Sequence, residues 1–351
     1  MSTVEGLDTD ALAAWLGKER PGLLSGPLEA TLITGGKSNL TYAVTDGDAE
    51  VIVRRPPLGH VLATAHDMSR EHRVITALGP TEVPVPETFA LCEDDTVIGA
   101  PFYVMERVAG TPYGRAMQLQ ELGRDRTRAI TEHMVDTLVT LHSVEPASVG
   151  LGDFGRPDGY LERQVRRWKK QLDASRSRDL TGMDELIANL EADIPSGGDA
   201  TIVHGDFRLD NLLVDAAPDG EGDTITAVLD WEMSTLGDPL TDLAVLLAYQ
   251  QLAETVRPSG AVKAMISDAA LASGYLPRED VLRRYHEQSG RDVDDLDFHL
   301  ALAFFKLAVI LEGIHYRHSH GQTLGSGFDG IGDLIEPLIA AGLHAGRVDE
   351  T

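Results

Sequence analysis

His204-Gly205-Asp206-Phe207-Arg208-Leu209-Asp210-Asn211 is the segment of the sequence that decides the fold. It starts at the end of the short apolar run 201–204 and is followed by another, 212–214. A third apolar run, 225–229, leads into Asp230-Trp231-Glu232, where a further carboxylate follows Asn211 by nineteen residues. Asp and Asn are favoured in turns for local hydrogen bonding, so each residue alone could simply cap a strand. The order of strand, loop, hairpin and second carboxylate instead favours a shared function.

The spacing of these polar side chains matches one kind of chemistry. Phosphoryl transfer of the kinase type needs one group that orients and accepts the proton of a hydroxyl, and two groups that hold Mg2+ against the phosphates. A carboxylate, an amide five residues later and a carboxylate across a hairpin supply these groups. The pattern therefore predicts Asp206 as the catalytic base, with Asn211 and Asp230 as the metal ligands.

The periodicity of the apolar residues divides the chain into a part rich in strands and a part rich in helices. An opening helix over 8–25 comes first, and the following strand-rich part has one more helix at 66–78 and strands at 28–33, 40–44, 51–53, 87–92 and 101–108. From about Leu119 the pattern predicts helices at 124–142, 159–175, 183–192, 239–252, 262–274, 278–290, 294–319 and 331–345. The three apolar runs around the polar segment are the strands expected between these helices.

Composition excludes several classes of protein. The formal net charge of −26 argues against a nucleic-acid partner, because such binding depends on basic residues that neutralise phosphates. Cys92 is the single cysteine, so no intrachain disulfide can form. The first thirty residues contain no apolar stretch of signal-peptide length. The most apolar segment, 298–314, is interrupted by Lys306 and Glu312 and predicts a buried helix rather than a membrane span. We therefore expect a cytoplasmic protein without a membrane anchor.

The polar segment also resembles a known family. His204-Gly205-Asp206 with Asn211 and Asp230, followed by Gly237-Asp238-Pro239 and Asp242-Leu243-Ala244, is similar to the aminoglycoside phosphotransferase family of small-molecule kinases, over about Ile33 to Arg317. The segments 35–42, 54–57 and 312–317 most resemble the branch that includes the kinase domain fused to acyl-CoA dehydrogenases. The resemblance implies an α+β, protein-kinase-like bilobal fold. Its small antiparallel-sheet lobe, 1–107, would bind nucleotide, and its mainly helical lobe, 108–351, would carry the catalytic loop and the substrate site.

In such a fold the turn at 35–42 would cover the triphosphate of ATP, with contacts from Gly36, Ser38 and Asn39. A glycine pair between strands is otherwise typical of a simple turn. The resemblance also implies that Arg54 contacts the α- and β-phosphates and forms an ion pair with Glu71. Many relatives carry lysine in place of Arg54, and a guanidinium can hold two oxygens at once where lysine is a point charge. Alternation along the strand leaves Arg55 as the rival phosphate ligand, because only one of the two can point inward.

The end of the strand-rich part resembles the segment that binds adenine in kinases. The resemblance places the carbonyl of Glu106 and the N–H of Val108 against the purine, with Met105 behind it. Ile52 and Leu213 would enclose the ring. An ordinary strand and linker would have the same apolar sequence, so this assignment depends on the resemblance.

Two residues are expected to support the catalytic loop. His204 is interpreted as a hydrogen-bonded core residue, and Asp242 as the group that holds the loop backbone, although a helix-cap role would also explain an aspartate there. The histidines at 315, 318 and 320 resemble a metal site only weakly, because closed zinc sites are built from sets of Cys and His.

The acceptor is a small-molecule hydroxyl, and the resemblance places Glu232, His315 and Arg317 near it. Because 315–320 is neutral to basic, an anionic metabolite such as a hydroxyacyl thioester is favoured over the polycationic aminoglycosides, which are the alternative. Arg317 could instead neutralise a helix C-terminus. A catalytically silent nucleotide-binding module is the second alternative, indicated only by Arg54. ATP with Mg2+ is the expected donor, while GTP and the oligomeric state are left open.

Overall fold

The computed structural model describes residues 4–33, 39–58, 67–196, 198–217, 222–256, 266–321, 328 and 330–346. The chain divides into two compact units. The first comprises Met1–Gly110 and Thr226–Ser234, and the second comprises Thr111–Ile225 and Thr235–Thr351. The predicted flap residues Gly36 and Ser38 lie outside the described residues.

A five-stranded antiparallel sheet is the centre of the first unit. Its strands are β1 (Glu29–Leu32), β2 (Leu40–Thr45), β3 (Glu50–Arg55), β4 (Thr88–Cys92) and β5 (Phe102–Glu106), in the order β1-β2-β3-β5-β4. The β-branched run Val51-Ile52-Val53 pairs with β2 on one side and with β5 on the other. The sheet predicted from the sequence is confirmed.

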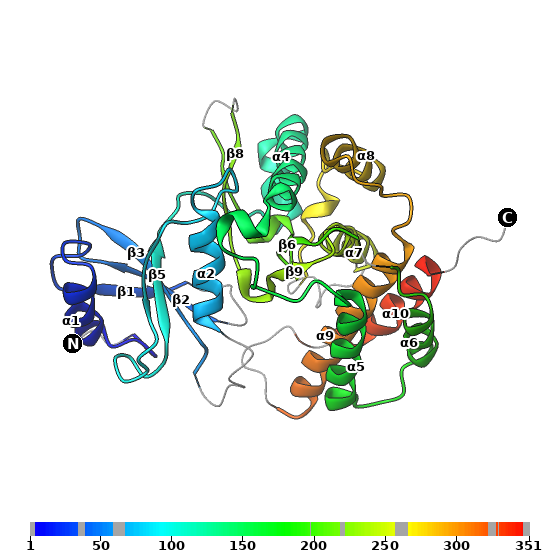
Figure 1. The fold of residues 1–351 in the computed structure, drawn as a ribbon, viewed down its shortest axis with the longest axis horizontal. Helices are drawn as coiled ribbons and strands as arrows, with labels where there is room; N and C mark the ends of the chain where they lie inside the picture. The colour runs from blue at the N-terminus through cyan, green and yellow to red at the C-terminus, as the bar shows by residue number, and fades with distance from the viewer. Residues whose placement is uncertain are drawn as a thin grey trace. The chain divides into compact units, whose positions relative to one another are not determined.

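Each face of this sheet packs against one helix, as Figure 1 shows. Because side chains alternate along a strand, Tyr42, Val53 and Phe102 lie in one apolar cluster together with Leu12 and Leu16 of α1 (Thr9–Glu19). The helix α2 (Met68–Leu78) packs against β4 and β5, and the side chain of Asp67 caps its first turn by accepting from the N–H of Arg70. Alternation thus directs Arg54 and Arg55 to opposite faces.

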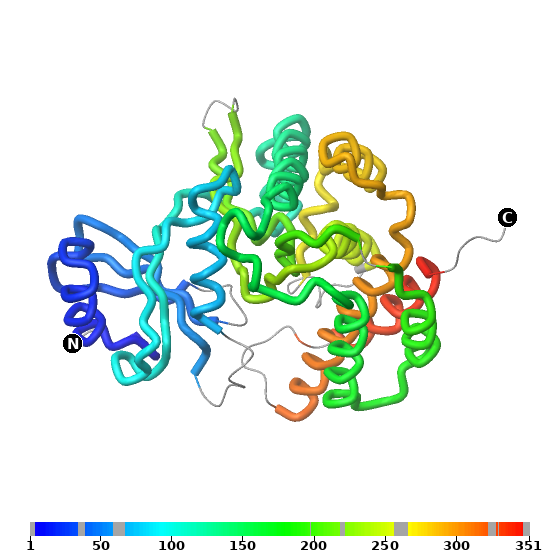
Figure 2. The backbone as a smooth tube through the Cα atoms, viewed as in Figure 1, coloured from blue at the N-terminus to red at the C-terminus, as the bar shows by residue number. Residues whose placement is uncertain are grey.

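Helices dominate the second unit. They are α3 (Ala116–Leu122), α4 (Arg124–Ser143), α5 (Tyr160–Ser175), α6 (Met183–Ala192), α7 (Leu240–Val256), α8 (Arg278–Ser289), α9 (Asp297–Ser319) and α10 (Ile335–Ala345). The apolar helix α9 lies against α5, α6, α7 and α10 (Figure 2). It is long and apolar enough to cross a membrane, but 83% of its most apolar window is buried inside the protein. The prediction of a buried helix is confirmed.

Short strands carry the polar segment of the second unit. Strand β6 (Thr201–Val203) leads into the loop, a 3-10 turn at Leu209–Asn211 follows, and β7 (Leu212–Asp215) continues the chain. Strand β6 pairs with β9 (Thr235–Gly237), and β7 forms a two-stranded sheet with β8 (Thr224–Val228). The hairpin expected across the polar segment is therefore present.

Two local predictions were wrong, and two short elements were missed. The opening helix ends at Glu19 rather than at residue 25, because Pro21 disfavours helical backbone at the residue before it. Where a helix was predicted at 262–274, the described residues form only a 3-10 turn at Ala269–Leu271. There the Asp268 carboxylate accepts a hydrogen bond from the N–H of Ala116, 2.9 Å away, so tertiary hydrogen bonds replace a helical turn. The short elements α3 and β9 were not predicted.

Gly274 gives a test of this packing. Its φ is +97°, and a Cβ atom there would lie 2.1 Å from the carbonyl oxygen of Arg124. We expect Gly274→Ala to lower the free energy of unfolding by about 2–5 kcal/mol, because conformational strain and overpacking add. Gly290→Ala is the matched control, since Gly290 also has positive φ but has no atom within 4 Å of the added Cβ. It should cost about 1–2 kcal/mol. Equal losses in urea denaturation would contradict the steric argument.

Candidate active site

A buried ion pair organises the polar residues of the first unit. The Arg54 Nε atom donates to Glu71 Oε2 at 2.8 Å, so the pair expected between β3 and α2 is present. Arg54 also donates to the carboxylate of Asp230. Arg55 lies on the other face, where its guanidinium donates to the carbonyls of Gly6 and Ile98. Within this unit Arg54, and not Arg55, is therefore the arginine that meets the predicted metal ligand.

Glu71 receives further hydrogen bonds around that pair. The Tyr103 hydroxyl donates to Oε2 at 2.9 Å, and the Asn39 amide donates to Oε1 at 2.9 Å. Glu71 is 1% exposed, and burial raises the pKa of its carboxyl while Arg54 opposes that effect. A buried carboxylate with this many donors fixes the orientation of Arg54. It also ties Asn39, one of the residues predicted to contact the triphosphate from the flap, to α2.

Asp230 adopts an unusual backbone conformation. Its φ is 67° and its ψ is 60°, and it has the only positive φ among the described residues other than glycine. The indole N–H of Trp231 donates to the carbonyl of Val228 at 2.9 Å, which braces the same turn. Aspartate tolerates the left-handed region better than most residues, but the conformation still costs free energy and is concentrated at functional sites. This turn places the Asp230 carboxylate in contact with Arg54.

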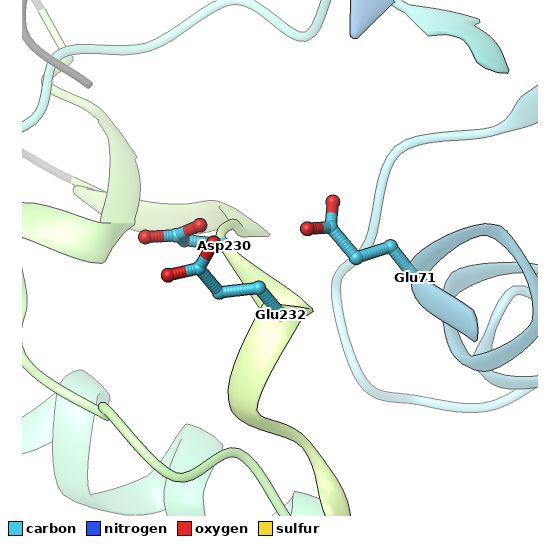
Figure 3. A group of neighbouring side chains, drawn as sticks. All are labelled: Glu71, Asp230 and Glu232. Carbon is cyan, nitrogen blue, oxygen red and sulfur yellow. The ribbon is translucent and has the colours of Figure 1, made fainter. Parts of the chain in front are cut away.

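Three carboxylates of this unit lie close together. Oxygen atoms of Glu71, Asp230 and Glu232 are all within 4.8 Å of one another. Figure 3 shows Asp230 and Glu232 side by side on one segment, with Glu71 extending toward them from α2. The Asn39 amide also reaches Glu232 Oε2, at 3.3 Å. Glu232, predicted near the acceptor, is therefore placed beside the residues predicted to hold metal and nucleotide.

In the second unit, Asp242 holds the loop that carries the predicted base Asp206. Its carboxylate accepts from the N–H groups of His204 and Gly205, both at 2.7 Å, and lies 3.3 Å from His142 Nε2. His142 in turn contacts the Tyr285 hydroxyl at 2.8 Å through Nδ1. Burial would raise the pKa of Asp242, but His142, His204 and the loop N–H groups outweigh it, so this pKa lies below its ordinary value. The carboxylate is ionised and serves the loop backbone.

Asp206 lies within a ring of cations and donors. Arg208 Nε is 3.4 Å from its Oδ2, and the Tyr249 hydroxyl also hydrogen-bonds to the carboxylate. The guanidinium of Arg208 lies over the Tyr249 ring, 4.6 Å from its centroid. Burial raises the pKa of Asp206, but Arg208, Lys306 and His204 outweigh burial, so the pKa is lowered. An ionised carboxylate held this way can accept a hydroxyl proton.

Asn211 is oriented by the same residue. Its Nδ2 donates to the Asp206 carbonyl at 2.9 Å and to Asp206 Oδ2 at 3.2 Å. The amide oxygen is thereby turned away from Asp206. Mg2+ prefers carboxylate and amide oxygens, and each unit by itself offers such groups. Asn211, in the second unit, offers an amide oxygen. In the first unit Asp230 and Glu232 offer partly exposed carboxylates with oxygen atoms within 4.8 Å of each other, and these two carboxylates fit a magnesium ion.

The remaining predicted residues are distributed over both units. Ile52 on β3 and Met105 on β5 are cross-strand partners and buried, and Val108, half-buried, follows the exposed Glu106. Leu213 is half-buried on β7 of the second unit. On α9, Arg317 is exposed and His315 is half-buried. The His315 ring lies close to Gly332, because a Cβ atom added to Gly332 would be 2.9 Å from that ring. Contacts of these residues with nucleotide or acceptor stay predictions.

Sequence reasoning missed four residues of the loop network. They are His142, Arg208, Tyr249 and Lys306. Arg208 lies inside the quoted motif, two residues after Asp206, and its position was a usable signal. The other three come from distant helices, and their helical periodicity is that of ordinary core residues.

Comparisons with known proteins identify relatives of the chain and solved structures that are similar to it. The profile of the "Phosphotransferase enzyme family" matches residues 29–296. The chain is 36% identical over 335 residues to acyl-CoA dehydrogenase family member 10 of Mus musculus, covering 94% of this chain and 30% of that protein. A solved Ralstonia eutropha protein, described as a candidate aminoglycoside phosphotransferase, is 32% identical, with a TM-score of 0.80 over 97% of this chain and 98% of its own.

A more distant solved structure shares the fold. The aminoglycoside phosphotransferase APH(4)-Ia, solved with AMP-PNP and hygromycin B, is 15% identical, with a TM-score of 0.59 over 97% of this chain and 99% of its own. The protein-kinase-like fold expected from the sequence is confirmed.

Asp242 gives a test of the loop network. Asp242→Asn should lower the free energy of unfolding by about 3–5 kcal/mol at pH 7, because an amide cannot accept from both loop N–H groups and balance His142. Since the folded pKa is depressed, the contribution is complete above the ordinary value of 3.8 and is lost as the pH falls through the folded pKa. Denaturation curves of the wild type and the variant should therefore converge at acid pH. Asp333→Asn, at an exposed carboxylate, is the control and should change stability by less than about 0.5 kcal/mol.

Proposed function

Because the chain belongs to the phosphotransferase enzyme family, we propose that it transfers the γ-phosphoryl group of ATP to a hydroxyl of a small molecule, with Mg2+ as cofactor. The observation that carries this proposal is the setting of Asp206. It is an ionised carboxylate at a loop whose backbone is held by Asp242 and which orients the Asn211 amide. Positioning and electrostatics, rather than covalent chemistry, are what phosphoryl transfer asks of a protein.

Asp206 acts as the base in this proposal. Its carboxylate accepts a hydrogen bond from the acceptor hydroxyl and takes the proton as the oxygen attacks the γ-phosphorus. The bond from the γ-phosphorus to the bridging oxygen of ADP breaks as the new bond forms. Arg208, which lies beside Asp206, offers a positive charge to the oxygens of the transferred group.

The metal and nucleotide ligands follow from the same family mechanism. Asn211 and Asp230 hold Mg2+, and the neighbouring carboxylate of Glu232 adds a third oxygen ligand. When bound, the ion neutralises charge on the phosphates. Arg54, oriented by Glu71, contacts the α- and β-phosphates, and Asn39 belongs to the flap above them. The proposed adenine site consists of backbone groups of Glu106 and Val108 with the side chains of Ile52, Met105 and Leu213.

We assign the acceptor to an anionic class, a hydroxyacyl thioester. The relative named as an acyl-CoA dehydrogenase family member supports this choice, although the chain spans only 30% of that protein's length. The end of α9 supports it through the exposed guanidinium of Arg317 and the nearby His315, since neither would attract a polycation. Measurement of ADP release from ATP, or of GDP release from GTP, with 2-, 3- and 4-hydroxybutyryl-CoA and with kanamycin as acceptors, tests the assignment. Faster turnover with kanamycin would favour the aminoglycoside alternative, and no turnover with tight nucleotide binding would favour a silent module.

The division of roles between two aspartates is testable. Asp206→Asn should lower turnover by about 10²–10⁴-fold while nucleotide affinity stays near that of the wild type, because the base does not hold the triphosphate. Asp230→Ala should instead lose the Mg2+-dependent part of nucleotide binding, measured by isothermal titration calorimetry with and without Mg2+. If both variants kept Mg2+-dependent binding, the assignment of Asp230 would be wrong.

Arg317 tests the acceptor class. A charge-assisted contact is worth about 1.5–3 kcal/mol, so Arg317→Ala should raise the KM for the active hydroxybutyryl-CoA at least tenfold. The KM for ATP should stay within about twofold. An unchanged KM for the thioester would leave Arg317 as a residue that stabilises the C-terminus of α9.

A further inference from the structure

Lys306 is a buried cation in the middle of the apolar helix α9. It is 6% exposed, and its ammonium group donates to the carbonyl oxygen of Gly205, the residue before Asp206. The ammonium also lies 5.7 Å from the centroid of the Trp168 ring on α5, a distance compatible with a cation–π contact. The side chain therefore extends from the helical core to the catalytic loop.

The surroundings of Lys306 make its burial costly. Burial lowers the pKa of its ammonium group, while the carboxylates of Asp206 and Asp242 favour the charged form. Moving an ammonium ion out of water is unfavourable, and an apolar side chain at this position of α9 would avoid that cost. The Gly205 carbonyl and the carboxylates of Asp206 and Asp242 offset this cost at the loop, and the Trp168 ring adds a contact from α5.

Gly205 is held at both of its polar backbone atoms. Its N–H donates to Asp242 Oδ1 at 2.7 Å, and its carbonyl accepts from Lys306. Its φ is +86°, a conformation in which glycine is favoured. The peptide groups that flank Gly205 are thus fixed by two helices, α7 through Asp242 and α9 through Lys306, and Asp206 follows directly.

We propose that Lys306 is a positioning residue of the phosphotransfer reaction: it locks the Gly205 carbonyl, and so sets the position and the electrostatic environment of the Asp206 carboxylate. The proposal rests on the proposed function for its kinetic consequence, whereas its structural consequence does not. Loss of the ammonium group frees the carbonyl side of Gly205 and leaves only the Asp242 side held. A displacement of a catalytic group by about 1 Å can cost a hundredfold in rate.

The structural arm of the test is hydrogen–deuterium exchange. Lys306→Met keeps an unbranched side chain of nearly the same length without the charge. It should speed exchange of the amides in 204–211, while peptides from α4 and α10 stay as protected as in the wild type. Lys306→Arg keeps a charged donor and should restore most of the protection. Lys170→Met, at an exposed lysine of α5, is the control and should change nothing. Unchanged exchange at 204–211 in Lys306→Met, or a general increase across the protein, would overturn the proposal.

The kinetic arm uses ATP hydrolysis and the active hydroxybutyryl-CoA. Lys306→Met should lower kcat about ten- to hundredfold with both KM values within twofold, and Lys306→Arg should recover part of the loss. A rise confined to the KM of the thioester would mean that Lys306 binds the acceptor, which contradicts a positioning role. If Lys306→Met does not fold, Lys306→Gln, which keeps an N–H donor, is measured instead and should show the same loss at lower magnitude. If the wild-type protein showed no phosphotransfer activity, the proposed function would be refuted. The hydrogen–deuterium exchange result would then decide whether Lys306 holds the loop.

Discussion

The buried carboxylate of Asp242 fixes the backbone on which the candidate chemistry depends. It accepts two N–H groups of the loop that begins at His204, and that loop carries Asp206 and orients Asn211. A loop in the interior of a unit must have its polar backbone groups satisfied, and here a side chain from a helix does so instead of a strand ladder. The short strand β6 and the strand β9 that pairs with it bring the loop to Asp242. The helices α4, α7 and α9 then supply the side chains that complete its environment.

The first unit also contains a buried carboxylate that accepts several hydrogen bonds, that of Glu71. Arg54, Tyr103 and Asn39 all donate to that carboxylate, from β3, from β5 and from the start of β2. In both units one desolvated carboxylate gathers donors from several elements, and the groups proposed to act lie next to it. A carboxylate of this kind destabilises the fold when it is buried without partners and stabilises the fold only when its donors are in place. Each network therefore favours one specific arrangement of the elements that supply the donors.

The sequence predicted the features that depend on residues close together in the chain or on a known motif. The loop motif, the hairpin after it and the buried helix around Lys306 followed from spacing and periodicity, whereas the ion pair between Arg54 and Glu71 followed from the family resemblance. His142 and Tyr249 could not be found that way, because a polar side chain on a core helix has the same spacing whether or not it meets the loop. The segment 262–274 failed for a related reason. In the described part of this segment, Asp268 accepts a hydrogen bond from the first turn of α3, more than a hundred residues earlier in the chain. The helix propensity of the segment itself cannot predict such a long-range contact.

The first unit is formed by two segments that are far apart in the sequence, and this has a consequence for how the chain folds during synthesis. That unit takes most of its residues from Met1–Gly110, but its last segment, Thr226–Ser234, is translated only after the long stretch from Thr111 to Ile225. A nascent chain that has just released β5 holds Arg54 and Glu71 without Asp230, so the network around Arg54 stays incomplete until residues made much later are added. Closing such a distant contact is slow, since the entropy of the intervening loop must be overcome first. The first unit therefore cannot be completed until Thr226–Ser234 has been made, and partly folded intermediates of this kind are prone to aggregate.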